Sequence, residues 1–454
     1  MKRFWLVLLT LGLVMAFSTS VFAADVKFTG SFYAAGMYLD NTSFMGNGSE
    51  KPSTAFYYQR MRIKAEFIAT PALKLVTQFD AMERMWGHVR STVPLVTAND
   101  VDSYGTRAEN ENIAFDYAYV WYASKIGIWE VGIMEDGVWG TQFGDNSEPE
   151  GKIKYTFIKM PFIAGLQILK LNEFSDNAVN ASVYSDRDVD KYQGFFIFNW
   201  KGGQAGVLGI FINNRSMKPN FWLWPVPSAY KQQVYGALPY VKAKFGPVAV
   251  EAEAWYLTGK VMKWQDEVPA IFLNDIDLSA WSVYVNAVAD FNMFYFGGTF
   301  AYLSGDDPTT TDKVEGGPGT VNGGRDWNPC LIMFNWDRNY WAGAMAGYGV
   351  TADSGVMTNA YFGQLKAGVR PISDLDIALS VAYAKADKLP TGFFEKDYGW
   401  EVDVTATYKI TNNLSYMLGA GYLFTGDYYE ATRAVITDNV EDNFIVLNKL
   451  TLTF

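Results

Sequence analysis

The stretch that decides the fold is Arg60-Met61-Arg62-Ile63-Lys64-Ala65-Glu66-Phe67, in which charged residues occupy the even positions and apolar residues the odd ones. Because successive side chains of a β-strand point to opposite faces, this alternation predicts a strand with one face in water and the other in an apolar environment. The pattern recurs in residues 115–121, 248–254 and 400–406. Soluble β-sandwiches also show this alternation. The connections between the strands are therefore needed to distinguish a soluble sandwich from a membrane barrel.

Short turns and long polar loops alternate along the chain. The short turns are expected at residues 70–72, 125–127, 164–165, 201–203, 246–247, 292, 371–374 and 410–413. The longer segments are residues 41–54, 87–110, 175–190, 265–277 and 304–328. Barrels that cross a membrane have short turns at one end and long loops at the other, whereas sandwiches rarely keep this order.

Aromatic residues gather near the expected strand ends. They are Tyr57, Tyr58, Trp86, Trp121, Tyr122, Trp129, Trp139, Trp200, Trp255, Tyr256, Trp281 and Trp400. Aromatic residues form 17% of the chain and charged residues 19%, below the roughly 25% charged content of soluble domains. Both features favour a barrel with aromatic girdles at two membrane interfaces.

The N-terminus predicts export from the cytoplasm. A basic start, an apolar run over residues 4–17 and a small-residue exit ending at Ala23 are typical of a secretory signal peptide. We therefore expect a signal peptide over residues 1–23 and a single barrel domain over residues 24–454. With one cysteine (Cys330), one histidine (His88) and a net charge of −11, the sequence excludes a disulfide framework, a C-x-x-C metal or haem motif and a nucleic-acid partner.

The C-terminus carries a family resemblance. Residues 444–454 alternate up to a final Phe454, and residues 26–33 read as a matching first strand. Behind a signal peptide, this arrangement resembles the Gram-negative outer-membrane porins. The resemblance implies periplasmic turns, extracellular loops, contact with outer-membrane lipid and lipopolysaccharide, and recognition of Phe454 by the barrel-assembly machinery as an insertion signal. It leaves a homotrimer and a single barrel open.

The spacing of these breaks predicts an all-β, transmembrane antiparallel β-barrel of about 18 strands, an even number as expected for bacterial barrels. Losing a hairpin around residues 349–357 would reduce the number to 16. A barrel of either size encloses an aqueous channel.

Strand alternation also predicts which residues line the pore. Charged residues on the lipid face would cost about 2–4 kcal/mol each near the bilayer centre, so they should face inward. The expected pore-lining residues are Arg60, Arg62, Lys64, Glu66, Asp116, Lys242, Lys244, Glu251, Glu253, Asp290, Lys366, Arg370, Glu401 and Asp403. General porins are similar in setting basic residues against acidic ones across the pore, and the alternative is a scatter of charges without functional order.

The connection over residues 304–340 is the longest. It turns aromatic near its end, which is unusual for a solvent-exposed loop and suggests a segment that folds inward and narrows the pore. The candidate constriction residues are Trp336, Asp337, Arg338, Tyr340 and Trp341. A purely external loop remains the alternative.

The sequence thus predicts a water-filled outer-membrane channel for small hydrophilic solutes and ions, with no bound cofactor or metal. The alternatives are a channel specific for sugars or organic acids, and a scaffold or adhesin barrel without free conductance. Catalysis is disfavoured because His88, the one histidine, has no obvious partner framework. A plugged 22-stranded transporter is disfavoured because the first strand begins directly after the signal peptide.

Overall fold

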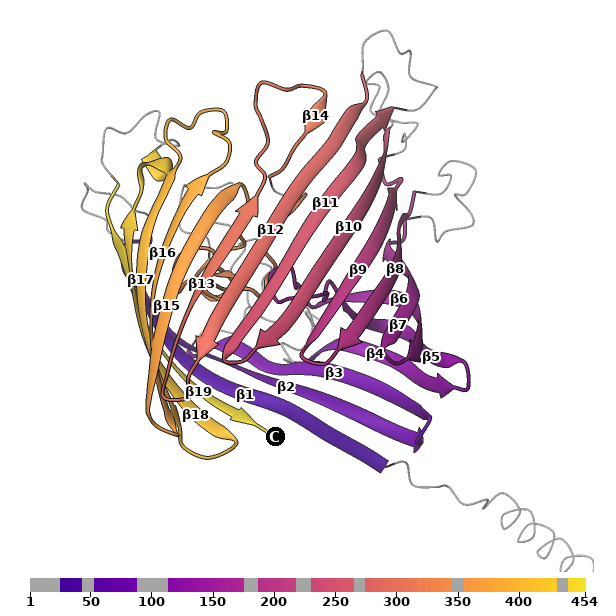
Figure 1. Ribbon diagram of the computed structural model, residues 1–454, viewed down its shortest axis with the longest axis horizontal. Coiled ribbons are helices and arrows are strands. Elements are labelled where there is room, and N and C mark those ends of the chain that lie inside the picture. Colours follow the sequence, from indigo (N-terminus) through magenta and orange to yellow (C-terminus); the bar gives the residue numbers. More distant parts are fainter. Residues whose placement is uncertain are drawn as a thin grey trace, which may run out of the picture.

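Long antiparallel strands build most of the described part of the chain (Figure 1). The computed structural model describes residues 25–42, 53–87, 113–174, 187–217, 230–264, 274–317, 319–343, 355–430 and 440–454. Within these residues no helix is long and apolar enough to cross a membrane. The expected signal peptide lies outside the described residues.

Eighteen strands form one closed ring in the described ranges, which confirms the predicted fold class and excludes the 16-stranded alternative. They are β1 (Asp25–Leu39), β2 (Thr54–Thr70), β3 (Leu73–Met85), β4 (Ile113–Ser124), β5 (Gly127–Asp136), β6 (Glu148–Lys159), β7 (Phe162–Asn172), β8 (Val189–Trp200), β9 (Gly203–Asn214), β10 (Tyr230–Phe245), β11 (Val248–Trp264), β12 (Ile276–Asp290), β13 (Phe294–Leu303), β15 (Ala360–Ile372), β16 (Leu375–Ala386), β17 (Asp397–Lys409), β18 (Leu414–Thr425) and β19 (Asn443–Thr453).

Within the described ranges, three short elements stand outside this ring of strands. The two-residue strand β14 (Lys313–Val314) pairs in parallel with the start of β12. Helix α2 (Trp336–Ala342) and the 3₁₀ helix η2 (Asp427–Glu430) lie in connections between strands. Residues 355–357 form no strand, and residues 349–354 of the uncertain hairpin lie outside the described ranges.

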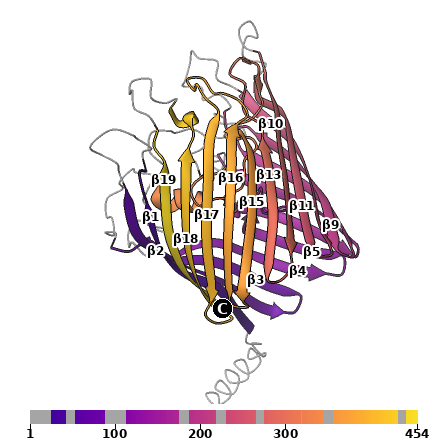
Figure 2. The same cartoon turned by 60° about the vertical axis from the view of Figure 1, so that its left-hand side comes forward.

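The ring closes where the last strand pairs with the first. β1 and β19 run antiparallel from the Ser31–Thr453 pair to the Leu39–Ile445 pair. This pairing leaves no free sheet edge. Figure 2 shows β15 to β19 continuing into β1 and β2 around the ring. The start of β1 and the C-terminus lie at the end of the barrel that carries the short turns (Figure 1), as an even strand number requires.

One predicted turn is wrong. Ala164 and Gly165 lie inside β7, and the chain reverses instead at Met160-Pro161. Proline has no backbone N–H to donate to the neighbouring strand, so Pro161 is suited to the turn and Gly165 to the strand. The other short turns lie where the sequence predicts them.

The two faces of the strands differ as the alternation predicts. On β18, Tyr416, Leu418, Tyr422 and Phe424 are exposed on the outside, while Met417, Gly419, Gly421 and Leu423 face inward and are more covered. Four of the twelve expected girdle aromatics are exceptions, because they contact residues inside the ring: Tyr58, Trp121, Trp139 and Trp255. Tyr58 follows the outward-facing Tyr57 directly, so period two turns it inward.

Candidate functional site

The inner face of the barrel is identified by two connections that cross it. The connection between β5 and β6 reaches β11, where Thr141 donates hydrogen bonds from its N–H and Oγ1 to Glu253 at 2.7 and 2.8 Å. It also reaches β12, where Phe143 stacks on Tyr284 with ring centroids 4.9 Å apart. A segment that begins on β5 can contact both strands only from inside the ring. We call residues 137–147 the short inward segment.

The connection between β13 and β15 also lies inside the ring. It runs from residue 304 to residue 359, longer than the predicted 304–340. Trp341 contacts Tyr58 of β2 at 4.4 Å between ring centroids, and Gln364 of β15 donates to the Pro329 carbonyl at 2.6 Å. Because β2 and β15 lie apart on the ring, residues 319–343 lie within the lumen; we call them the long inward segment.

Helix α2 carries the five candidate constriction residues. The Asn335 side chain caps it by accepting the Arg338 N–H at 2.8 Å. Arg338 and Trp341 are buried. The Arg338 Nε donates to the Ile332 carbonyl at 3.1 Å within the segment, whereas Trp341 packs against Tyr58 of the wall. Asp337 is exposed to the lumen, and Trp336 and Tyr340 are partly covered.

The short inward segment is the main feature that the sequence reasoning missed. Its signals are Gly137 and Gly140, which adopt φ values of 74° and 65°, a backbone region that favours glycine. Gly144 allows close packing, because an added Cβ would lie 1.9 Å from the Trp255 ring. Three glycines within eight residues between two strands indicate a connection that bends sharply.

The two inward segments are joined by backbone hydrogen bonds. Gly324 N–H donates to the Phe143 carbonyl at 2.7 Å, and Asp326 N–H donates to the Asp145 carbonyl at 3.0 Å. The Ser147 hydroxyl adds a hydrogen bond to the Asp326 carboxylate at 2.5 Å. Burial raises the pKa of the Asp145 carboxyl to about 7. The two connections therefore narrow the lumen as one body.

Arg60 and Arg62 lie in an ion-pair cluster on the inner face of β2 to β4. Arg62 binds Asp80 of β3 through two hydrogen bonds of 2.7 Å and lies 3.7 Å from Asp116 of β4. Arg60 lies 3.4 Å from Glu83. The acids of β3 are not among the predicted residues. The alternation Lys74, Gln78, Asp80 places Asp80 on the inner face, and a register shift beyond it turns Glu83 inward as well.

The other two charged residues of this stretch differ in their partners. Glu66 binds Lys74 at 2.8 Å near the turn end. Lys64 forms no ion pair within the described residues.

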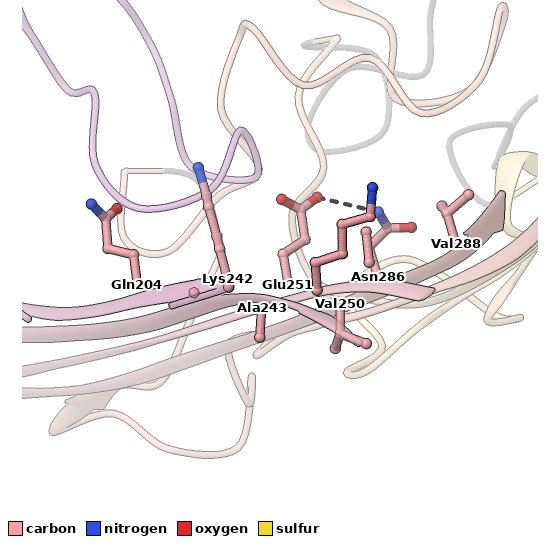
Figure 3. Close-up of a pocket in the computed structure, with 11 residues that line it drawn as sticks. Gln204, Lys242, Ala243, Val250, Glu251, Asn286 and Val288 are labelled. Atoms are coloured by element: carbon pink, nitrogen blue, oxygen red, sulfur yellow. Dashed lines mark hydrogen bonds between the residues drawn. The ribbon is translucent and has the colours of Figure 1, made fainter. Parts of the chain in front are cut away.

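The wall formed by β10 to β12 presents a second set of predicted residues. Figure 3 shows Lys242, Glu251 and Asn286 pointing to one side of the sheet, and Ala243 and Val250 to the other. Lys242 stands opposite Glu251 in the strand register. The depression that these inner residues line has a volume of about 530 Å³ and includes Lys244.

Hydrogen bonds fix the acids of this wall. Glu251 accepts hydrogen bonds from the Tyr284 hydroxyl at 3.0 Å and the Asn286 amide at 3.2 Å. Glu253 is committed to the short inward segment through Thr141.

The remaining predicted wall residues divide into two groups. At the turn end, Arg370 lies 3.0 Å from Asp290 and 2.9 Å from Asp376. Higher on β15, Lys366 lies beside the Tyr295 ring, 5.9 Å from its centroid.

Glu401 and Asp403 face inward but are covered by the long inward segment. The two Glu401 oxygens accept the backbone N–H groups of Ile332 and Met333 at 2.6 and 2.7 Å. Asp403 accepts that of Leu331 at 3.3 Å. These acids therefore anchor the segment to β17. With Cys330 they bring three ligand-type atoms within 4.8 Å of one another, but both Glu401 oxygens are already engaged.

Phe454 extends the closing seam by one residue. Its N–H donates to the Gly30 carbonyl at 3.0 Å, and the Gly30 N–H donates to the Phe454 carbonyl at 2.8 Å. His88 lies outside the described residues. Residues 186–190 have the spacing D-x-D-x-D, and the structure describes them from residue 187 on; Asp188 and Asp190 both bind Lys170, at 2.8 and 2.7 Å.

Comparison with known proteins places this geometry among solved barrels. No protein-family model matches the chain, and no curated protein matches it. The structure is similar to OccK9 (OpdG) of Pseudomonas aeruginosa, with a TM-score of 0.50 and 12% identity over 94% of this chain and 99% of that one. It is also similar to the outer-membrane protein OpdK of Pseudomonas aeruginosa (TM-score 0.48, 12% identity, 94% of this chain and 99% of that one covered).

A third solved structure is an anion-selective porin from Comamonas acidovorans (TM-score 0.45, 10% identity, 95% and 100% covered). At such identities a structural match establishes the fold alone. The chain therefore has the fold of the Gram-negative outer-membrane porins, a closed antiparallel barrel of 18 strands.

Proposed function

We propose that this protein is an outer-membrane channel through which small hydrophilic solutes and ions diffuse. The single observation that carries the proposal is the contrast between the two faces of the ring. The outer face exposes apolar and aromatic residues along the strands, while the inner face carries the ion pairs and lysines described above. Only an apolar solvent outside and water inside satisfy both faces.

The inward segments support selection among solutes. They occupy part of the lumen and are anchored on several strands, so a solute has to pass between them and the charged wall. Arg60 and Arg62 lie on this wall, and Asp337 lies on the segment that faces it. A lumen lined by charges of both signs focuses the local field and favours small polar solutes.

A channel specific for one solute class is the second candidate. The observation that favours it is the backbone junction between the two inward segments, which fixes the shape of the passage. The scaffold alternative requires an empty lumen for a partner, and the inward segments occupy that space.

The location and partners follow from the same proposal. Outer-membrane lipid and lipopolysaccharide would contact the apolar belt, and the barrel-assembly machinery would bind the β19 strand that ends at Phe454. A homotrimer and a single barrel are distinguished by the mass of the detergent-solubilised protein. Both assemblies allow conduction.

Liposome swelling tests the proposal. Vesicles containing the purified protein should swell in uncharged polyols at rates that fall steeply with solute size, as expected for a narrowed pore. If one sugar or organic acid causes swelling much faster than other solutes of the same size, the specific channel is favoured. Vesicles that contain folded protein and swell in no solute would contradict the proposal and favour a scaffold or adhesin.

A further inference from the structure

A polar cavity lies between the inward segments and the wall formed by β11 to β15. It has a volume of about 500 Å³, within the range of roughly 300–1,000 Å³ typical of small-molecule sites. The long inward segment contributes Asp326, Asn328 and Asp337, and the wall contributes Lys366 and Gln364. The cavity adjoins the depression of Figure 3, with which it shares Glu251 and Asn286.

Charges of both signs line this cavity without neutralising one another. Among the residues that the structure describes, Lys366 and Asp337 form no ion pair. The Asp326 carboxylate accepts the Ser147 hydroxyl and pairs with no described cation. The ammonium and the carboxylates line the same cavity but lie farther apart than an ion-pair distance. A solute therefore has room between them.

The neutral groups of the cavity supply further hydrogen-bonding capacity. Asn286 donates to Glu251 and accepts from the Thr299 hydroxyl at 3.0 Å, so a polar row crosses three strands of the wall. Gln142 of the short inward segment completes the lining from the opposite side. A solute here would exchange water for fixed amide, hydroxyl and charged groups.

We propose that this cavity is a binding subsite for a small zwitterion, a solute with one ammonium and one carboxylate group. Lys366 binds the carboxylate, and Asp337 with Asp326 binds the ammonium. Amides at the cavity wall accept or donate to the polar body of the solute. This inference rests on the proposed channel function and names the solute class that the channel retains longest.

Ion-current block in a planar bilayer tests the subsite. The probe is glutamine at pH 7, and the matched probe is N-acetylglutamine amide, which has the same side chain and neither charge. For the unmodified protein, glutamine should halve the current at a concentration about a hundredfold lower than the amide does, because each of its two charged groups gains a charge-assisted hydrogen bond worth about one decade of affinity.

Two variants and one control locate the effect. Lys366→Gln and Asp337→Asn should each raise the half-blocking concentration of glutamine about tenfold and leave that of the amide unchanged. The control is Lys396→Gln, which removes a lysine from the connection between β16 and β17, outside the cavity lining. It should leave both concentrations unchanged. Heat-modifiable migration verifies that each variant folds, and Asp326→Asn replaces Asp337→Asn if that variant does not.

The outcomes separate the subsite from the channel. Equal block by the two probes, or unchanged block in the folded Lys366 and Asp337 variants, would overturn the subsite while the measured current leaves the channel function standing. Inserted protein that passes no current at all would overturn both.

Discussion

Neutralising Arg60, Arg62 and Lys64 together should shift the selectivity of the channel toward cations. Arg60 and Arg62 lie in ion-pair reach of Asp80, Glu83 and Asp116. Replacing Arg60, Arg62 and Lys64 with glutamine makes the charge of this wall more negative by three units and leaves those three acids without their arginine partners. Those acids lie on the inner face, so the excess charge acts on ions in the lumen.

The size of the effect follows from Coulomb's law. Three charges about 10 Å from a passing ion contribute about 1.2 kcal/mol in water, which screening reduces to about 0.45 kcal/mol at ~0.1 M salt. A cation gains this energy and an anion loses it. The cation-to-anion permeability ratio should therefore rise about fivefold at ~0.1 M salt and about twentyfold at ~0.01 M, with little change at ~1 M.

The assay is the reversal potential of reconstituted channels in a salt gradient. The matched control replaces Lys125, Lys159 and Lys201 with glutamine, which removes the same charge at or beside the short turns between strands. The control should shift the ratio much less. A folded Arg60/Arg62/Lys64 variant whose selectivity at low salt equals that of the unmodified protein would refute the reasoning, because these charges would then lie away from the conducting path.

Three further predictions concern assembly, the inward segments and pH. Deleting Phe454 removes its two hydrogen bonds to Gly30 and should lower the amount of assembled barrel in membranes far more than the rate of synthesis; equal amounts of heat-modifiable protein would argue against a role in closure. Gly324→Ala places a Cβ 2.0 Å from the Asp145 carbonyl oxygen and should separate the inward segments. We expect this change to lower the stability of the barrel by about 1–3 kcal/mol and to increase open-channel noise. Gly363→Ala, whose added Cβ meets no atom within 4 Å, should change neither the stability nor the noise. A Gly324→Ala channel as quiet and stable as the Gly363→Ala control would count against the junction. Because the pKa of Asp145 is raised from 3.8 to about 7, its contribution to stability is fully present below pH 4 and is lost as the pH rises through 7. Asp145→Asn should therefore flatten the pH dependence of the heat-modification temperature between pH 4 and 7. An unchanged profile would contradict this assignment.

The barrel could be predicted because the alternation of side chains along a strand depends only on neighbouring residues. Alternation in residues 60–67 requires only that neighbouring side chains face opposite sides, and the same rule applies to each strand separately. The wrong predictions concern residues whose position is set by a connection between strands and not by strand alternation. Trp139 has the composition of a girdle residue, but its indole donates to the Leu238 carbonyl inside the ring because the short inward segment bends inward.

The site was less predictable because it depends on contacts between distant segments. Glu401 and Asp403 face inward as their alternation requires, yet nothing in their own strand indicates that residues 331–333 cover them. The acids that balance Arg60 and Arg62 lie on β3, where a register shift between the Gln59 and Met61 pairings interrupts the simple pattern. Strand periodicity gives the face of a residue, and the partner on that face comes only from the register.

The most direct test of the central claim is the single-channel current of the purified barrel in a planar bilayer. A water-filled lumen narrowed by two joined inward segments predicts discrete insertion steps, each with a steady current that rises linearly with voltage. Folded, heat-modifiable protein that inserts into the bilayer and gives no current steps at any voltage would contradict the claim that this barrel is a channel.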